Sequence, residues 1–131
     1  MIRALALAVL ALDVLVLAAG CGARPEAAAS GGVATELTVF PKSPAALRPA
    51  TLRLRFTDDR GRAVTPDVLE AEVQMAGMVH GAERLAFRSV GEGRYEAAHV
   101  FSMDGTWEIQ VRATIGANTY ATRRSLGVGS E

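Results

Sequence analysis

The sequence contains a single cysteine, Cys21, among its 131 residues. One cysteine cannot form an internal disulfide, and it cannot supply the several thiolates that a zinc or iron–sulfur cluster needs. An excess of charge of either sign is also lacking, since 14 basic side chains balance 14 acidic ones. Because a nucleic-acid-binding surface needs a basic stripe to neutralise phosphates, we expect no nucleic acid as a partner.

The sequence also lacks the motifs that usually accompany catalysis. It has no Gly-x-Ser-x-Gly turn that would expose a nucleophilic serine, and no Gly-x-Gly-x-x-Gly or Walker pattern that would bind phosphates. Glu70 and Glu72 lie on the outward face of one expected strand, where a solvated surface is a better interpretation than an acid/base pair. We therefore expect that the protein is not an enzyme. A hydrolase or oxidoreductase would need a cofactor pocket that no motif indicates.

The first 20 residues predict an export signal. After Arg3 comes a nearly unbroken run of Ala, Leu and Val, interrupted by Asp13, which ends in small residues directly before Cys21. The run is shorter than the ~20 apolar residues that a membrane-spanning helix needs. Small residues before a cysteine resemble the lipobox of bacterial lipoproteins. We therefore expect residues 1–20 to be a lipoprotein signal peptide and Cys21 to carry the lipid, the alternatives being an uncleaved anchor or an ordinary secretory signal.

Residues 21–34 predict a flexible tether. The segment is rich in glycine, alanine and serine, and such residues cannot bury enough apolar surface to offset the entropy of ordering. With a lipid on Cys21, the tether would hold an exported domain at the cell envelope, on the extracytoplasmic (periplasmic) side of its membrane.

Residues 35–131 predict one all-β domain. Residues 51–57 and 68–75 alternate between apolar and polar side chains, which is typical of strands with one buried face. Pro41 and Pro44 exclude a helix from the first connection. About seven strands at short spacing, with no helical segment after the signal-peptide helix and the tether, predict an antiparallel β-sandwich of immunoglobulin type. The expected strands lie near residues 36–40, 51–57, 68–75, 85–89, 94–103, 107–112 and 119–128.

Soft metal donors cluster in one stretch. Met75, Met78 and His80 fall within a few residues, and Met103 ends a later expected strand, just before a turn at Gly105. Thioether sulfur and neutral imidazole are soft or borderline ligands that keep their lone pairs at neutral pH, so together they suit Cu(I). All four donors could converge if the strands through Met75 and Met103 finish at the same pole of the sandwich, which the sequence leaves open.

The same residues have a structural interpretation. Met75 and Met103 continue the inward phase of their strands, and methionine commonly fills irregular core space. His80 could be a solvated loop residue. His99 falls in the inward phase of its strand, as a satisfied core histidine or an additional ligand, and the structural role is favoured. Met78, between glycines in a loop, has the least structural reason to be methionine.

The stretch resembles the YtkA-like/FixH-like domain family. Three motifs carry the resemblance: Met75-Ala76-Gly77-Met78-Val79-His80, then Gly93-Arg94-Tyr95-Glu96-Ala97, then Phe101 to Trp107 with its Phe-x-Met-x-Gly-x-Trp pattern. Where the family typically has Met-Pro-Gly-Met-Gly-His, this loop carries alanine and valine, and all donor positions are kept. The resemblance implies a small extracytoplasmic sandwich that handles copper, including delivery to respiratory oxidases. By motif it implies four ligands: Met75, Met78, His80 and Met103.

The residues predict a membrane-tethered, extracytoplasmic protein that binds copper as Cu(I) and hands it to a membrane partner, and the resemblance implies that this partner is a respiratory oxidase or an oxidase-assembly protein. The alternative is a non-metal immunoglobulin-like interaction module of a cell-envelope complex, in which the methionines only pack.

Overall fold

The computed structural model describes residues 32–130, and within that range the regular elements are all strands. No helix in this part of the chain is long and apolar enough to cross a membrane. The predicted signal peptide, Cys21 and most of the predicted tether lie outside the described residues. The eight strands are β1 (Val33–Phe40), β2 (Pro49–Asp58), β3 (Val68–Met75), β4 (Glu83–Arg84), β5 (Arg88–Gly91), β6 (Arg94–Val100), β7 (Gly105–Ile115) and β8 (Asn118–Val128).

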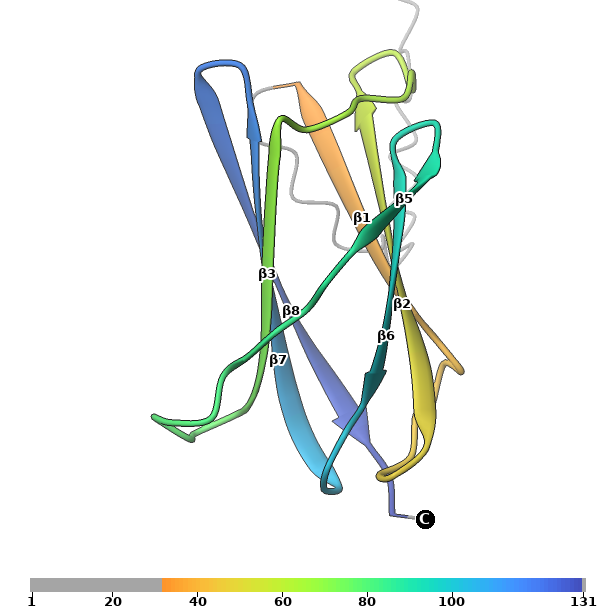
Figure 1. Cartoon of the computed structure of the whole chain (residues 1–131), viewed down its shortest axis with the longest axis vertical. Helices are drawn as coiled ribbons and strands as arrows, with labels where there is room; N and C mark the ends of the chain where they lie inside the picture. The colour runs from red at the N-terminus through yellow and green to blue at the C-terminus, as the bar shows by residue number, and fades with distance from the viewer. Residues whose placement is uncertain (1–31, 131) are drawn as a thin grey trace, which may run out of the picture.

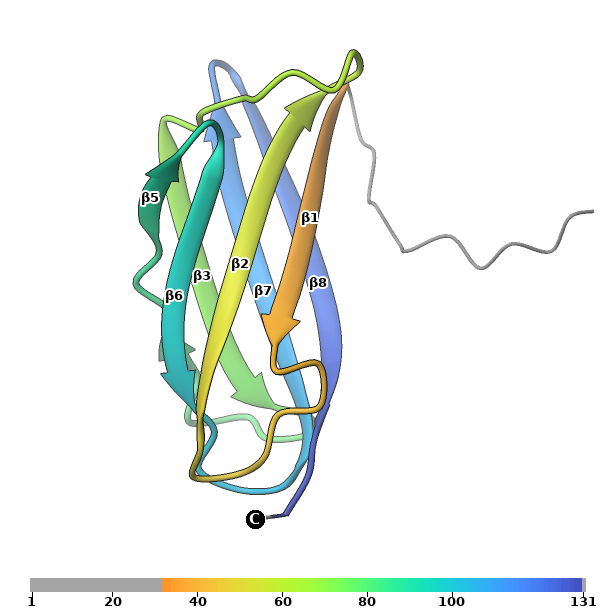
Figure 2. The ribbon, with the colours of Figure 1, turned by 90° about the vertical axis from the view of Figure 1, so that its right-hand side faces the viewer.

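The strands form two four-stranded antiparallel sheets, in the orders β1-β2-β6-β5 and β4-β3-β7-β8. The sheets pack face to face, as Figures 1 and 2 show. The predicted immunoglobulin-like sandwich is confirmed. The expected strand near residues 85–89 is instead two short strands, β4 in one sheet and β5 in the other. Leu85 is buried at the point where the chain crosses from one sheet to the other. Its apolar character therefore reflects burial at a crossing and not membership of one continuous strand.

The core lies between the sheets and follows the alternation of the sequence. In β2, Leu52, Leu54 and Phe56 are fully or almost fully buried. In the other sheet, Val73 of β3 stands opposite Ile109 of β7, and both are completely buried. Apolar burial on this scale is the main force that holds the two sheets together.

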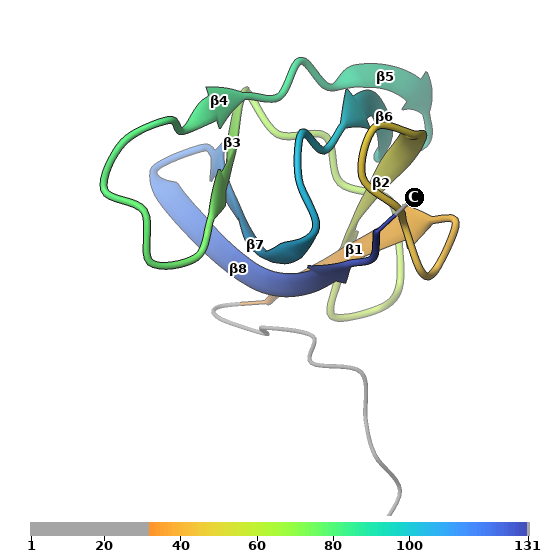
Figure 3. The same cartoon turned by 90° about the horizontal axis from the view of Figure 1, so that it is seen from below.

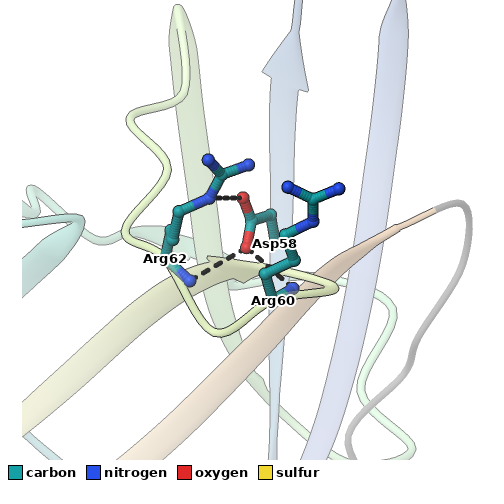
Figure 4. A network of polar contacts seen from close by, with 3 residues as sticks. All are labelled: Asp58, Arg60 and Arg62. Atoms are coloured by element: carbon teal, nitrogen blue, oxygen red, sulfur yellow. Dashed lines mark hydrogen bonds and ion pairs between the residues drawn. The ribbon is translucent and has the colours of Figure 1, made fainter.

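The strands run between two poles. At the first, which we call the entry pole, Val33 begins β1 opposite Asp58, the last residue of β2. Figure 4 shows how the turn after β2 is fixed there. The Asp58 carboxylate accepts the backbone N–H groups of Arg60 and Arg62 at 2.9 Å each, and Nε of Arg62 at 2.8 Å. These bonds lower the pKa of the Asp58 carboxyl, with the Arg62 backbone N–H as the largest cause.

We call the opposite end the methionine pole and define it by the connecting segments 41–48, 76–82 and 101–104 (Figures 1 and 3). The register of the strands shows that these segments lie at the same end of the sandwich. Each segment is connected to strand ends that pair with one another. The pairs at this end are Phe40 with Thr51, Pro49 with Val100, Met75 with Trp107, and Gly105 with Val128.

The prediction that a strand continues to Met103 is wrong. β6 ends at Val100, and residues 101–104 form the turn into β7. Phe101, the first residue of the turn, keeps the inward phase of β6 and is fully buried. The Trp107 indole N–H donates to the Met103 carbonyl oxygen at 3.0 Å. The backbone of Met103 is therefore held by a side chain of the following strand and not by a sheet partner.

Candidate metal centre

The three methionines that follow Met1 and both histidines all lie at the methionine pole, in or beside its segments. β3 and β7 are neighbours in one sheet, so the end of β3 and the turn that precedes β7 meet at the same end of the sandwich. The condition that the sequence left open is therefore met. The five residues are Met75 at the end of β3, Met78 and His80 in segment 76–82, His99 near the end of β6, and Met103 in segment 101–104.

Met75 is partly buried at the edge of the core. It stands opposite Trp107 in the β3–β7 ladder, and the N–H of Ala76 donates to the Thr106 carbonyl at 2.8 Å. Its terminal Cε lies 2.7 Å from the position that a Cβ on Gly105 would take. The side chain therefore lies over the first residue of β7, next to the turn that carries Met103.

Met103 does not fill the core. About half of its surface is exposed, at 48%, whereas Trp107, which fixes its backbone, is almost fully buried. A sulfur atom on an exposed side chain has no packing role to give up when it binds a metal. The core interpretation of Met103 therefore does not hold, and its role as a ligand stays a prediction.

Met78 and His80 are exposed in segment 76–82. The Met78 N–H donates to the Met75 carbonyl at 3.2 Å, and positive φ angles at Gly77 (79°) and Gly81 (95°) shape the two sides of the loop. Figure 3 shows this loop at one side of the pole, with the 101–104 turn nearer the middle. The pair therefore lies at the same pole as the other candidate donors and plays no part in the core.

His99, which the sequence left as a core histidine or an additional ligand, is buried at this pole. Its side chain is 9% exposed, and its ring packs edge-on against Phe101 and Trp107, with centroid distances of 4.8 and 6.4 Å. Its Nδ1 lies 4.0 Å from the Glu83 carboxylate, whereas its Nε2 is buried and has no hydrogen-bond partner within residues 32–130. Burial lowers the pKa of His99, and the charge of Glu83 opposes that shift.

The electrostatics of His99 favour a neutral ring with a free lone pair. A neutral imidazole carries one N–H and one acceptor nitrogen, and a proton on Nδ1 faces Glu83, which leaves Nε2 as the acceptor. A buried polar atom without a partner costs about 1–3 kcal/mol, and a bound ion is one way to satisfy it. The inward phase of β6 was visible in the sequence. The orphaned nitrogen was not, because it depends on what β4 and β7 place around the ring.

Residues 28–112 match the protein family described as YtkA-like. The chain belongs to the YtkA-like family. The matched region covers β1 to most of β7 and includes all five donor residues. No curated protein sequence matches the chain.

Solved structures similar to this YtkA-like chain support the fold. A DUF4426 family protein from Pseudomonas aeruginosa PAO1 aligns with a TM-score of 0.62 at 12% identity, over 82% of this chain and 99% of that one. The Yersinia pseudotuberculosis adhesin InvE aligns with a TM-score of 0.55 at 17% identity, over 76% of this chain and 28% of the adhesin. The Lin-41 filamin domain gives 0.50 at 10% identity, over 70% and 90% of the two chains.

The donor chemistry of this YtkA-like domain fits a soft cation. Within residues 32–130, no group of three or more His, Cys, Asp or Glu side chains could hold a metal ion. The five candidate donors at the methionine pole are thioethers and imidazoles, a set that would suit Cu(I) better than calcium or magnesium, which prefer oxygen. The unpartnered Nε2 of His99 is the structural feature that a metal would complete.

A groove elsewhere on the domain does not compete as a metal site. It has a volume of about 540 Å³, and its lining includes Glu70, Arg84, Arg112 and Arg123 and none of the five donors. The oppositely charged Glu70 and Arg112 lie 3.9 Å apart across its wall, with both side chains largely exposed. Solvated charges of both signs offer no binding site for a soft cation.

Proposed function

We propose that this YtkA-like domain is an exported, membrane-tethered protein that binds copper as Cu(I) and passes it to a membrane partner such as a respiratory oxidase or its assembly factor. The observation that carries the proposal is the buried, unpartnered Nε2 of His99 at the same pole as three methionines. A core histidine without this role would be expected to have a hydrogen bond on both ring nitrogens.

The donors divide into two groups. Met75 and His99 are held by strands β3 and β6 and by their packing against Gly105 and Trp107. Met78, His80 and Met103 are on exposed segments. Cu(I), when bound, is a soft cation that exchanges between thioether and imidazole ligands without redox chemistry. The held donors would give affinity, and the exposed donors would let a partner's ligands replace them one at a time.

Export and anchoring rest on the sequence. The apolar segment before Cys21 and the lipobox-like residues support a lipid-anchored chain, and the resemblance to FixH-like domains supports an extracytoplasmic site of action. The alternative function is a non-metal interaction module of a cell-envelope complex. The specific observation in its favour is the exposed apolar surface of the methionine pole. The two functions differ in whether the domain binds copper.

Anaerobic Cu(I) titration against a chromophoric Cu(I) chelator tests the proposal. We expect tight binding by the wild-type protein, and an affinity loss of about tenfold or more for Met78→Leu/His80→Ala and for His99→Phe, since each removes donors. Val90→Ala is the matched control, because Val90 is an exposed apolar residue of β5 that is not a donor. Equal affinities in all four proteins would sink the copper assignment and leave the interaction module as the better function.

A further inference from the structure

Exposed apolar side chains gather at the methionine pole. Of the eight large apolar side chains that the described residues expose, only Val68 and Val90 lie away from it, on β3 at the entry pole and on the short edge strand β5. A clustered apolar surface on a soluble domain marks an interaction site, whereas scattered residues do not. The six at the methionine pole are Phe40, Leu47, Met78, Val79, Val100 and Met103.

Three of these residues are brought together by the sheet register. Phe40 pairs with Thr51 and Val100 pairs with Pro49, so both flank the start of β2. Leu47 joins them because its N–H donates to the Phe101 carbonyl at 2.8 Å. The Leu47 bond joins these residues to the segment that carries Met103. Val79, which is 87% exposed between Met78 and His80, lies at the same pole on loop 76–82, at one side of it (Figure 3).

Leu47 adopts a backbone conformation that leucine rarely takes. Its φ is +62°, in the left-handed region where a bulky side chain is strained. Hydrogen bonds fix the chain at this point, from the N–H of Ala46 to the Gly129 carbonyl and from Leu47 to Phe101, each 2.8 Å long. The side chain is 62% exposed and does not stabilise the core. Strained residues that the surrounding structure holds in place cluster at functional sites.

The charge of the pole argues against a lipid surface. Segments 41–48, 76–82 and 101–104 carry two basic residues, Lys42 and Arg48, and one acidic residue, Asp104. Surfaces that bind anionic bilayers use clusters of four or more basic side chains, because each contributes attraction near the headgroups. An almost neutral apolar surface fits another protein better.

The path of the chain determines which end of the domain is farther from the tether. β1 begins at the entry pole, so the segment from Cys21 enters the domain at the end opposite the donors. β7, with 11 residues, spans about 36 Å at 3.3 Å per residue. The 12 residues from Cys21 to Gly32 reach at most about 40 Å when fully extended. If Cys21 carries a lipid, the methionine pole can face the anchoring membrane only when the tether runs back along the length of the domain. This path would take almost the whole extended length of the tether.

We propose that the methionine pole is the docking surface for a copper-carrying protein. This partner reaches away from the membrane that anchors the domain, and it presents an apolar, uncharged surface around its own thioether or imidazole ligands. This inference rests on the proposed function. Ligand exchange requires that the two metal sites touch, and apolar contact around them excludes water while leaving the partners free to separate. A second copy does not fit, because two copies tethered to one membrane would point their poles in the same direction.

Site-specific photo-crosslinking in the full-length protein tests the docking surface. A photoreactive residue replaces Val79 in one variant and Val90 in the control, and adducts formed in intact cells are identified by mass spectrometry. We expect the Val79 variant alone to form an adduct with a different envelope protein that exchanges Cu(I) with this domain when both are purified. An adduct with lipid, an adduct with a second copy, or no adduct would overturn the proposal.

Surface variants separate docking from copper binding. We expect Phe40→Ser/Leu47→Gly/Val100→Ser to slow Cu(I) exchange with the adduct partner by about tenfold or more, because a few central apolar residues carry most of the energy of an interface. Its Cu(I) affinity should stay within about threefold of wild type, because none of the three is a donor. The matched control, Val68→Ser/Val90→Ser, should leave both unchanged. Exchange as slow in the control as in the triple variant would contradict the docking site.

The two proposals fail in different ways. A wild-type protein that binds no Cu(I) refutes the proposed function, whatever the crosslinks show. A protein that binds Cu(I) but yields a lipid adduct, a self adduct or no adduct from position 79 refutes the docking surface alone. Thermal melting of every variant, compared with wild type, shows that the substituted proteins are folded.

Discussion

Met75 and Gly105 depend on each other. The terminal methyl of Met75 lies 2.7 Å from the position that a Cβ on Gly105 would take, and Gly105 has a φ of +131°. Glycine is therefore needed at the start of β7 for its backbone conformation and for the space that the methionine occupies. Through Gly105, a candidate ligand is coupled to the turn that carries Met103.

Gly105→Ala should destabilise the fold by about 1–3 kcal/mol, because alanine is strained at this φ. The end of Met75 is flexible and can move, so most of the cost lies in the backbone. Urea unfolding measures the change. Gly127→Ala is the matched control, since a Cβ at Gly127 meets nothing within 4 Å and its φ is not positive. Equal destabilisation by the two substitutions would contradict the argument.

Met75→Leu should keep the fold and weaken copper binding. The two side chains have similar volumes, and such swaps usually cost less than about 1.5 kcal/mol. Leucine has no thioether, so Cu(I) affinity should fall while the urea midpoint changes little. Leu52→Met, a swap in the opposite direction within the buried core, should leave the affinity unchanged. A large loss of stability without a loss of affinity would assign Met75 to packing alone.

The stability of the metal-free protein should fall as pH decreases below about 6.5. Burial lowers the pKa of His99 from its ordinary value of 6.5. Between that lowered pKa and 6.5 the unfolded chain binds the proton more readily than the folded chain, so folding loses stability as pH falls through this window. Thermal melting across the window measures the slope.

His99→Phe supplies the comparison for that slope. Phenylalanine fills the space against Phe101 and Trp107 and does not titrate, so this component of the pH dependence should disappear. His80→Ala changes an exposed loop residue and should keep it. A slope that survives in His99→Phe would assign the effect to another group.

Asp58→Asn should lower the melting temperature without changing Cu(I) affinity. The carboxylate accepts three N–H groups from Arg60 and Arg62 at the entry pole, far from the donors. Because the pKa of Asp58 is lowered, its contribution is present above the ordinary value of 3.8 and is lost as pH falls through the folded pKa. The melting curves of the wild-type protein and the Asp58→Asn variant should therefore converge in acid; a constant difference would contradict this origin.

Cys21→Ser should release the exported protein from the membrane fraction, since the predicted lipid needs the cysteine sulfur. Fractionation of cells followed by immunoblotting measures the distribution. Ser30→Ala, in the same predicted tether, should leave the protein with the membranes. Retention of the Cys21→Ser protein in the membrane fraction would refute the predicted anchor.

The sequence by itself determined most of the strands and the class of fold. The alternation of apolar and polar residues along β2 and β3 indicates which side of each strand is buried. This pattern can be recognised within one segment, without knowing which segments pair with it. It also placed Met75 and His99 on the inward phase. The sequence did not predict that β6 ends at Val100. The alternation continues through Phe101 and does not indicate the turn whose backbone Trp107 holds.

The tertiary structure decided how the donors are related. The pairing of β3 with β7 brings Met75 to the turn of Met103, and the position of β4 brings Glu83 to Nδ1 of His99 while Nε2 stays without a partner. The gathering of apolar side chains around these donors, and the entry of the chain at the opposite pole, also depend on strand pairing. Contacts between segments distant in the chain are set by the packing of the two sheets, and no pattern within one segment specifies them.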